Sequence, residues 1–483
     1  MFERIPKEGL TFTKWFDNIL EKAELYDYGR YPVKGCGIWL PYGFKIRQLV
    51  LNFMRNLLNT SGHEEILMPL LIPEDLLSKE KEHIEGFRGE VYWVTKGGDE
   101  NLDVKLALRP TSETVISLYE SFWLKSYKQL PRKYYQIASI FRYETKATKP
   151  MIRVREVTTF KEAHTVHGSY KDAERQVLEA INIYRKFFDE LGIPYIISKR
   201  PDWDKFAGAL YTIAFDTVMP DGRTLQIGTV HNLGQNFTKV FEVRIQLADE
   251  TIDYAWQTSY GISERVIAAL VSVHGDDLGL ILPPKFAPIQ VIIIPIPAKE
   301  LWDKILEMSR KVCNELRSHG IRAYVDDRIE FSPGYKFYDW ELKGVPLRIE
   351  IGSKEVKTDT LTLADRLERK RKQVAIDNIV SQVKVELERI EEKIKKRAKE
   401  WFKAKKSRAK SINEAQKILK KIRGIVELPW CGKEECGYKL EEILEVKVLG
   451  SPLPTLEEVK VENLKCPICG DKALTIIRLA KQY

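Results

Sequence analysis

Residues 141–167 read FRYETKATKPMIRVREVTTFKEAHTVH, and this stretch decides the fold. Its first four residues alternate between apolar and charged, which predicts a β-strand with Arg142 and Glu144 on one face. Residues 145–150 are polar and end in proline, as in a connecting loop, and β-branched residues return over 151–159. The stretch therefore predicts a hairpin that carries charged side chains on one surface.

That surface has the composition of an anion site. Arg142, Arg153 and Arg155 would lie beside Phe160, and arginine forms bidentate contacts to phosphate and carboxylate groups. An aromatic ring among such arginines suits a base, so a nucleotide site is favoured over a salt-bridged face exposed to solvent. The sequence contains neither a Walker loop nor a G-x-G-x-x-G motif, so side chains of this kind would have to hold the nucleotide.

Length and composition indicate a globular protein. The chain has 483 residues, enough for roughly two to four domains, and 44% of them are hydrophobic. No apolar run approaches the ~18 residues of a membrane span, and the first ten residues lack a signal-peptide core. We therefore expect a soluble, cytoplasmic protein without a membrane partner.

Positive charge is concentrated near the C-terminal third. Between Glu391 and Arg423, 14 Lys and Arg stand against 4 Asp and Glu, a net +10 that exceeds the +9 of the whole chain. Such a run favours a polyanionic partner, although a solvated helix face explains it equally well.

Four of the six cysteines form two close pairs. Cys431 and Cys436 have the spacing C-x4-C, and Cys466 and Cys469 the spacing C-x2-C. Two such pairs suit a tetrahedral four-thiolate zinc site. Disulfides are the alternative, and the expected cytoplasmic location disfavours them.

Helical and strand patterns divide the chain into three domains. Residues 1–284 mix amphipathic helices with strands, and the polar cluster LRPTSE precedes one of these helices. There Thr111 and Glu113 either cap the helix or contact a ligand. Residues 285–392 alternate strands and helices, which predicts an α/β domain with a parallel or mixed sheet. Residues 393–483 form a small α+β unit that holds the cysteines.

Several segments together resemble one enzyme family. FRYE is similar to motif 2 of the class II aminoacyl-tRNA synthetases, the helix and strand that end at Pro69 resemble motif 1, and YGISER resembles motif 3. RPTSE, KFAGA, QIGTVHNLGQNF and WELKGVPLR resemble the prolyl-tRNA synthetases in their archaeal and eukaryotic-like form. The resemblance spans nearly the whole chain. It implies a catalytic domain built on an antiparallel sheet, followed by an anticodon-binding domain and a zinc-binding C-terminal domain.

The resemblance implies a site for ATP, Mg2+ and L-proline. Arg142 and Arg265 would be catalytic, because both would hold the phosphates and Arg142 also the proline carboxylate. Thr111 and Glu113 would accept hydrogen bonds from the secondary ammonium of proline. The other residues implied to contact proline are His164, Phe206 and His231, and those implied to contact ATP are Glu144, Arg153, Phe160, Gln226, Thr229 and Ser263.

The resemblance also implies partners beyond the small substrates. Glu341, Arg348 and Lys354 occupy the family's positions for reading the anticodon of tRNA(Pro). Arginine can hold the two acceptors of guanine and glutamate can accept from its amino group. The motif 1 region would form a homodimer, and Cys431, Cys436, Cys466 and Cys469 would bind a structural Zn2+. The segment between His167 and Tyr260 is too short for the hydrolytic insertion of bacterial-type enzymes, so we expect misactivation of alanine and cysteine without editing in the same chain.

Two other functions share part of this pattern. A class II synthetase for another amino acid would keep Arg142 and Arg265, but the set of Thr111, Glu113 and His231 argues against it. A non-catalytic tRNA-binding protein would lose the arginines, all of which are present here.

Overall fold

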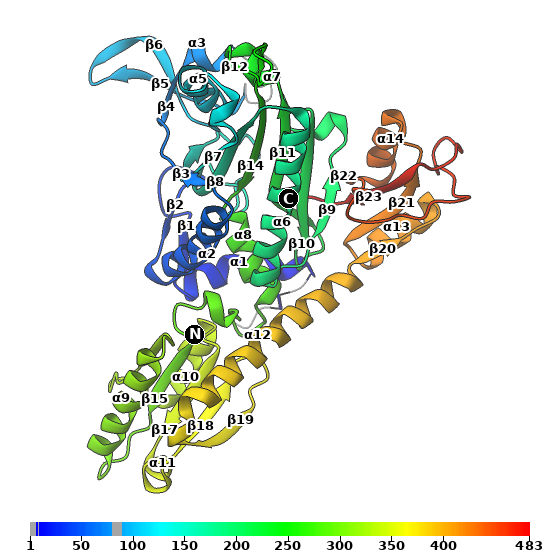
Figure 1. Cartoon of the computed structure of the whole chain (residues 1–483). Helices are drawn as coiled ribbons and strands as arrows, with labels where there is room; N and C mark the ends of the chain where they lie inside the picture. Colours follow the sequence, from blue (N-terminus) through cyan, green and yellow to red (C-terminus); the bar gives the residue numbers. More distant parts are fainter. Residues whose placement is uncertain (1–5, 8, 80–88) are drawn as a thin grey trace.

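The computed structural model describes residues 6–7, 9–79 and 89–483. The chain forms three units, each with its own sheet and apolar core. Figure 1 shows the first unit at the top, the second at the lower left and the third at the right, with a long helix running from the second to the third.

A seven-stranded sheet organises the first unit, in the order β3-β7-β8-β14-β11-β10-β9. Only the pairing of β3 with β7 is parallel, so the expected antiparallel catalytic sheet is confirmed. The strands are β3 (Glu64–Glu65), β7 (Arg132–Phe141), β8 (Glu156–His167), β9 (Ile196–Lys199), β10 (Tyr211–Val218), β11 (Thr224–Gly234) and β14 (Trp256–Ile262).

The hairpin of the motif 2 region lies elsewhere than the residue pattern predicts. Its strands are β7 and β8, so residues 142–144 and 151–155, predicted as strand, lie in the loop between them together with the predicted loop 145–150. The apolar residues Met151, Ile152 and Val154 are buried, the first two in the main core of the unit. Their apolar character therefore marks burial of a loop, and the alternation of arginines does not arise from a strand.

Four helices of the described part of the chain cover one face of this sheet, and α5 (Glu113–Trp123) and α7 (Asn236–Val240) cover only part of the other, which is called the open side below. α2 (Pro41–Thr60), α6 (Tyr170–Leu191) and α8 (Arg265–His274) pack on the covered side with α1 (Phe12–Lys22). Alternation along β8 sends Lys161 toward Tyr184 of α6, whereas Phe160 and Glu162 face the open side.

A small sheet, β4-β6-β5, flanks the open side. The expected motif 1 strand that ends at Pro69 is not formed over residues 66–69, and β4 begins only at Leu71. The buried Arg109 holds the segment by donating to the carbonyls of Met68 and Pro69. The remaining elements of the unit are β1 (Tyr26–Tyr28), β2 (Gly37–Trp39), β4 (Leu71–Pro73), α3 (Glu74–Leu77), β5 (Tyr92–Gly97), β6 (Glu100–Leu108), β12 (Arg244–Gln246) and β13 (Ile252–Tyr254).

The second unit is the expected α/β domain with a mixed sheet. The order is β16-β15-β17-β18-β19, in which β15 runs parallel to β16 and β17 while β18 is antiparallel to both its neighbours. Its elements are β15 (Val291–Pro295), α9 (Trp302–Ser318), β16 (Ala323–Val325), α10 (Pro333–Leu342), β17 (Leu347–Ile351), α11 (Ser353–Thr358), β18 (Thr360–Asp365) and β19 (Arg371–Ala375).

The third unit is a four-stranded sheet, β20-β21-β23-β22, with two helices. Its elements are β20 (Lys406–Arg408), α13 (Ile412–Lys421), β21 (Ile425–Trp430), α14 (Glu434–Leu444), β22 (Lys447–Gly450) and β23 (Thr475–Ala480).

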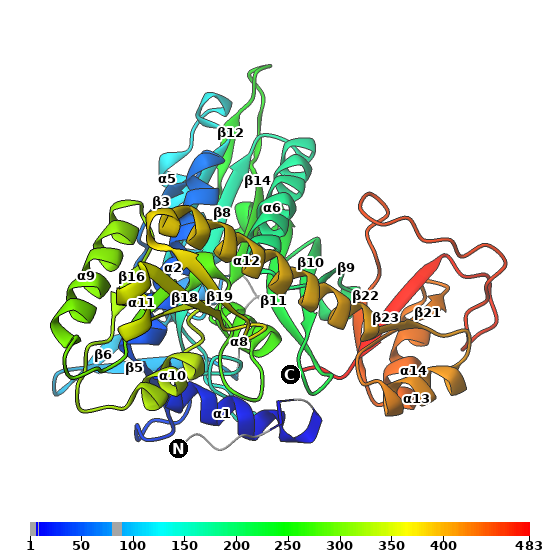
Figure 2. The ribbon, with the colours of Figure 1, turned by 90° about the horizontal axis from the view of Figure 1, so that it is seen from below.

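One helix joins the second and third units. α12 (Ile379–Ala404) is continuous across the boundary expected at residues 392/393. Its buried positions, among them Leu387, Ile390, Ile394 and Ala398, recur every three or four residues through that point, so only the surface charge changes there. Figure 2 shows α12 crossing beneath the first unit. Within the described residues, no helix is long and apolar enough to cross a membrane.

Candidate active site

A cavity of about 250 Å3 opens on the uncovered face of the seven-stranded sheet. The loop 142–155 forms one side, and β8, β11, β14, the start of α8, the start of α5 and residues 204–206 contribute the other walls. Twelve of the predicted site residues line it: Thr111, Glu113, Arg142, Glu144, Arg153, Phe160, Phe206, Gln226, Thr229, His231, Ser263 and Arg265.

Arginines gather at one end of the cavity. Nε of Arg142 donates to the carbonyl of Pro110 at 3.2 Å, and Nε of Arg265 donates to that of Ile152 at 2.8 Å. Nε of Arg153 lies 3.8 Å from a carboxylate oxygen of Glu144. Burial lowers the pKa of Arg142, and burial with the charge of Arg142 lowers the pKa of Arg265 to about 10. Both remain charged at neutral pH, so this end suits a polyanion.

A flat aromatic surface adjoins the arginines. The guanidinium carbon of Arg142 lies 5.8 Å from the centre of the Phe160 ring. A Cβ placed on Gly261 of β14 would lie 3.4 Å from the ring, so glycine there leaves no side chain beside Phe160. A planar base can stack on such a surface.

A second polar group of the cavity contains a buried carboxylate. Glu113 is buried at the first position of α5, where it accepts hydrogen bonds from Thr111 Oγ1 at 2.5 Å and from Ser259 Oγ at 2.8 Å. Ser112, and not Thr111, stands at the N-cap position of α5. Thr111 and Glu113 thus form one polar group that suits a small cation with N–H donors.

Glu162 is a site residue to which sequence reasoning assigned no role. Its Oε1 accepts hydrogen bonds from Ser112 Oγ and Gln136 Nε2, both at 2.5 Å, and its Oε2 accepts from the backbone N–H of Ser112 at 3.2 Å. Burial alone would raise the pKa of Glu162, but hydrogen bonds from His164, Ser112 and Gln136 lower it to about 2. Glu162 therefore fixes the loop that carries Thr111. Its position two residues from Phe160 on a strand was the available signal.

His164 lies behind this group. The residue was expected to line the proline pocket, but it is buried and absent from the cavity lining. Its Nε2 lies 3.4 Å from Glu162 Oε2. Although burial alone would lower the pKa of His164, the carboxylates of Glu162 and Glu113 raise it.

His231 and Phe206 form an apolar wall. Their ring centres are 4.6 Å apart, and Thr212 Oγ1 lies 2.8 Å from Nδ1 of His231. Burial lowers the pKa of His231 to about 4, so the ring is neutral at neutral pH and contributes no charge to the wall. This wall suits a small aliphatic ring.

A β-bulge gives β11 its spacing of polar residues. Phe215 of β10 pairs with Gly228 and Asp216 with Gln226, so Ile227 is an extra residue without a partner. The bulge resets the alternation of side chains, which allows Gln226, Thr229 and His231 all to reach the cavity.

Glu264 is a second residue that sequence reasoning missed, and it also lines the cavity. It accepts hydrogen bonds from Thr158 Oγ1 at 3.1 Å and from the backbone N–H of Thr159 at 3.2 Å. Burial nevertheless raises its pKa to about 7.

A separate cavity in the second unit contains two of the three residues expected to read an anticodon. Glu341 and Arg348 line it, together with Arg366, Arg369 and Arg371. Lys354 lies in α11 and is absent from the lining.

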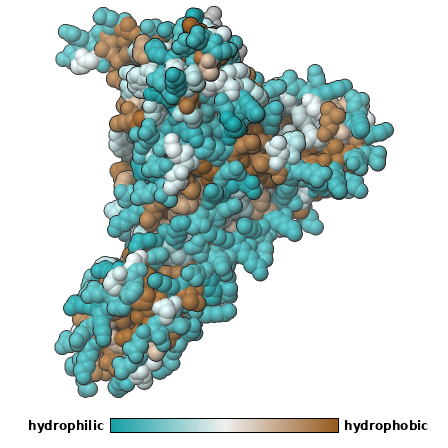
Figure 3. Space-filling model, in the orientation of Figure 1, coloured by the Kyte–Doolittle hydropathy of each residue, from teal (hydrophilic) through white to brown (hydrophobic). Residues whose placement is uncertain are grey.

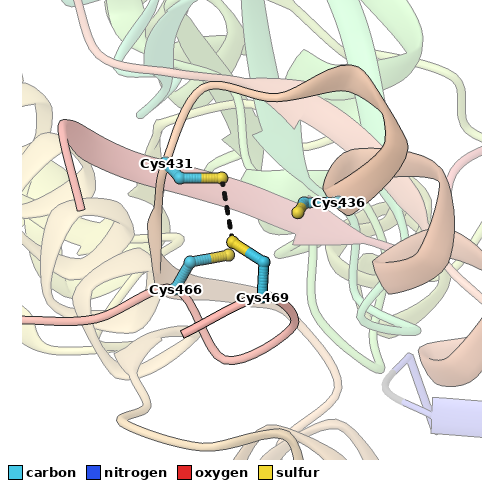
Figure 4. Close-up of side chains that lie close together, drawn as sticks. All are labelled: Cys431, Cys436, Cys466 and Cys469. Atoms are coloured by element: carbon cyan, nitrogen blue, oxygen red, sulfur yellow. Dashed lines mark hydrogen bonds between the residues drawn. The ribbon is translucent and has the colours of Figure 1, made fainter. Parts of the chain in front are cut away.

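The four paired cysteines converge in the third unit. Their sulfurs all lie within 4.8 Å of one another, and those of Cys431 and Cys469 are 3.6 Å apart (Figure 4). That separation exceeds a disulfide bond of ~2.05 Å and is close to the ~3.8 Å between thiolates bound tetrahedrally to Zn2+. The donor set therefore fits zinc, with Cys431 just after β21, Cys436 in α14, and Cys466 and Cys469 in the loop before β23.

Three family models match the chain, one in each unit. Residues 92–274 match the class II tRNA synthetase core domain of the G, H, P, S and T group. Residues 290–397 match an anticodon-binding domain, and residues 412–483 match the C-terminal domain of prolyl-tRNA synthetase.

Similar proteins match almost from end to end. The proline–tRNA ligase of Aeropyrum pernix is 59% identical over 474 residues, which cover 98% of this chain and 97% of that protein. The proline–tRNA ligase of Sulfurisphaera tokodaii is also 59% identical, with 98% of each chain covered. The structure of Giardia lamblia prolyl-tRNA synthetase in complex with prolyl-adenylate superposes with a TM-score of 0.96 at 36% identity, covering 99% of this chain and 100% of that one.

Proposed function

Because the chain belongs to the proline–tRNA ligase family, we propose that it activates L-proline with ATP and transfers it to tRNA(Pro). In the first step a carboxylate oxygen of proline attacks the α-phosphorus of ATP. The bond from that phosphorus to the bridging oxygen breaks, and pyrophosphate leaves. In the second step the terminal ribose hydroxyl of the tRNA attacks the carbonyl carbon, loses its proton and expels AMP.

The charged groups that line the cavity carry the proposal. Arg142, Arg153 and Arg265 offer guanidinium groups to an anion, and Glu113 with Thr111 offers a carboxylate and a hydroxyl to a cation. Prolyl-adenylate carries both kinds of group, a phosphate in its middle and an ammonium group at its proline end. The Giardia enzyme is described with this intermediate bound, which supports the assignment.

The arginines would act on the phosphates. Arg142 would bridge the carboxylate of proline and the α-phosphate, which brings two anions together and stabilises the charge of the transition state. Arg153 and Arg265 would hold the outer phosphates of ATP, which enters as its magnesium complex. Their backbone and carboxylate contacts fix these side chains before substrate arrives.

Adenine and proline would occupy the two remaining surfaces of the cavity, the aromatic surface at Phe160 and the wall formed by Phe206 and His231. Adenine would stack on Phe160 near Glu144, while Gln226, Thr229 and Ser263 contact ATP. The ring of proline would lie against Phe206 and His231, and its two N–H groups would donate to Thr111 and Glu113. We assign His164 a supporting position behind Glu162.

Pyrophosphate exchange with each of the twenty amino acids tests this activity. We expect proline to support the fastest exchange. Faster exchange with another amino acid would show that this amino acid, and not proline, is the substrate. No exchange with any of the twenty would refute the proposed activation of an amino acid.

We propose that the second unit reads the anticodon of tRNA(Pro). Arg348 and Glu341 lie in a cavity with three further arginines, which suits guanine bases and their phosphates. Arg348→Ala should weaken tRNA charging and leave proline activation unchanged, and Lys354→Ala should have the smaller effect. Equal charging of tRNA with and without the anticodon guanines would contradict the assignment.

We propose a homodimer formed through the motif 1 region. Large apolar side chains are exposed in the motif 1 region and in β5 and α5 beside it, and Figure 3 shows brown atoms near the β4-β5-β6 sheet at the top of the molecule. Leu67 is 79% exposed and Phe122 61%, which favours burial against a second copy. Sedimentation of a monomer at micromolar concentration would contradict this proposal. The exposed set is Leu67, Leu70, Leu71, Trp93, Tyr119, Phe122 and Trp123.

We propose that Cys431, Cys436, Cys466 and Cys469 hold one Zn2+. When bound, the ion would supply structure by joining Cys431, just after β21, and Cys436, in α14, to the loop before β23, and no step of the reaction needs it.

A further inference from the structure

The third unit contacts the first through the edge of the seven-stranded sheet. Lys199, the last residue of β9, exchanges two backbone hydrogen bonds with Ser451, at 2.8 and 3.1 Å. Gly450 makes this approach possible, because its φ is +105° and a Cβ there would lie 2.0 Å from the carbonyl oxygen of Lys199. The two units therefore meet backbone to backbone beside Arg200.

Arg200 joins this interface to the cavity. Its side chain is 2% exposed. Nη1 donates to the carbonyl of Leu449 in β22 at 2.5 Å, and Nη2 donates to Asp216 Oδ1 at 2.8 Å and to Gln226 Oε1 at 3.0 Å. One guanidinium thus contacts the third unit with one nitrogen and a cavity-lining side chain with another.

The remaining contacts fix where this guanidinium lies. Asp216 and Gln226 are opposite each other on β10 and β11, beside the bulge, so Arg200 spans both strands. Nε of Arg200 lies 3.5 Å from Asp204 Oδ2, and Asp204 also lines the cavity. With three polar partners in the first unit and one in the third, the guanidinium has little freedom to move.

We propose that Arg200 is a positioning residue for ATP, through which the third unit orients Gln226. The carbonyl of Leu449 holds the guanidinium, and the guanidinium holds the side-chain oxygen of Gln226, which leaves the amide N–H groups of Gln226 as donors for the nucleotide. The inference rests on the proposed function, because it requires Gln226 to contact ATP. It gives the third unit a part in nucleotide binding in addition to its own fold.

The conservative variant Arg200→Lys tests the proposal. Lysine keeps the charge beside Asp216, but its single nitrogen cannot contact both the carbonyl of Leu449 and the side chain of Gln226 as the two Nη atoms of arginine do. We expect the KM for ATP in pyrophosphate exchange to rise about tenfold, as for loss of a hydrogen bond from a charged donor, while the KM for proline changes less than twofold. Equal changes in the two KM values would overturn the proposal.

Arg478 offers a matched control in the same interface. It is also fully buried, and its Nη1 donates across the interface to the carbonyl of Ile197 at 2.7 Å. Its contacts include Ser198 and Glu427 but no residue that lines the cavity. Arg478→Lys should lower stability and keep the KM for ATP. A rise equal to that of Arg200→Lys would mean that any loosening of the interface has this effect, which would overturn the specific role of Arg200.

A double-mutant cycle separates positioning from a merely structural effect. In a Gln226→Met background, Arg200→Lys should raise the KM for ATP no further, because the side chain it positions is gone. Additive effects would overturn the proposal. If Gln226→Met itself leaves the KM for ATP unchanged, the assignment of Gln226 under the proposed function fails and the inference fails with it. If Arg200→Lys leaves the KM for ATP unchanged while Gln226→Met raises it, the role of Arg200 is overturned and the proposed function stands.

Gly450→Ala tests the contact between Leu449 and Arg200 by a change in the third unit. The added Cβ would lie 2.0 Å from the carbonyl oxygen of Lys199 and 3.2 Å from Cα of Arg200, so it would push β22 away from β9 while the Arg200 and cysteine side chains keep their identity. We expect a rise in the KM for ATP in the same direction, again without an effect on proline. An enzyme with an unchanged KM for ATP would show that docking of the third unit is not needed, and the proposal would be wrong.

Discussion

Arg265 at the first turn of α8 donates its Nε hydrogen to the carbonyl of Ile152, 2.8 Å away in the loop between β7 and β8. Two segments that are far apart in the sequence are thereby held together at the arginine end of the cavity. The bond uses only one edge of the guanidinium, so further N–H groups of Arg265 are available to a phosphate. Loop and helix therefore form one anion site before ATP binds.

Arg142→Ala should lower proline-dependent pyrophosphate exchange by roughly 10²–10³-fold, as for the loss of one preorganised donor. Arg155→Ala is the control, because Arg155 belongs to the same loop but lies over Tyr143, outside the cavity lining. Near-wild-type exchange in Arg142→Ala would refute the phosphate role.

Glu113→Gln should raise the KM for proline more than the KM for ATP, because it removes the negative charge beside the ammonium group. Glu144→Gln should do the reverse, since Glu144 lies at the arginine end next to Arg153. Kinetic constants for both substrates in both variants make the comparison. An equal rise of the two KM values in Glu113→Gln would show that this residue does not belong to the amino-acid pocket.

Metal analysis should find about one zinc per chain, and Cys436→Ser should reduce it. Cys313→Ser is the control, because Cys313 is buried in α9, away from the cluster. A chelator that removes the metal should lower the melting temperature of the third unit. A disulfide among the four cysteines in protein kept reduced would refute the zinc site.

Acid should destabilise the protein through His274. Burial lowers its pKa to about 3, against a value of about 6.5 in an unfolded chain. Because the folded-state pKa is the lower one, this stabilisation is complete above pH ~6.5 and is lost as the pH falls toward 3. At pH 5 the loss should be about 2 kcal/mol.

His274→Gln should therefore show a smaller decline in unfolding free energy between pH 7 and pH 5. The exposed residue His319 provides the control, and His319→Gln should behave as the wild type does. Denaturant titrations at the two pH values measure the difference. Parallel curves for His274→Gln and the wild type would show that His274 is not the group responsible.

Alanine and cysteine should be activated at detectable rates, because loss of methylene contacts discriminates by only about 1–3 kcal/mol. Residues 168–259 form α6, β9–β11, α7, β12, β13 and part of β14, all within the catalytic unit, which leaves no separate hydrolytic domain there. Pre-formed alanyl-tRNA(Pro) should accordingly survive incubation with the enzyme. Hydrolysis well above the spontaneous rate would contradict this expectation.

The sequence predicts the overall fold well because its signals are periodic. Amphipathic helices such as α6 follow from apolar spacing, and Gly192 ends that helix with φ +67° as expected of a left-handed cap. The loop between β7 and β8 is the main exception, since a buried loop and a strand present the same β-branched residues. Whether such residues form a loop or a strand depends on how they are buried in the tertiary structure, and this burial leaves no periodic pattern in the sequence.

The candidate site is predicted only in part for a similar reason. Arginines and aromatic residues carry recognisable chemistry, so Arg142 and Phe160 stand out. Glu162 and Arg200 act through contacts with residues distant in the sequence. The only local signal for Glu162 is its place two residues after Phe160, and nothing local distinguishes Arg200 from an ordinary surface charge. The bulge at Ile227 is likewise invisible, because it depends on the partner strand.

The continuity of α12 limits how this chain can change its length. Each residue of an α-helix turns the chain by about 100° and advances it by about 1.5 Å. A single inserted residue near the middle of α12 would therefore swing the third unit around the helix axis and pull Leu449 away from Arg200. Surface loops can absorb such insertions. In α12 the number of residues between the second and third units must stay fixed, because it sets the rotation of one unit relative to the other.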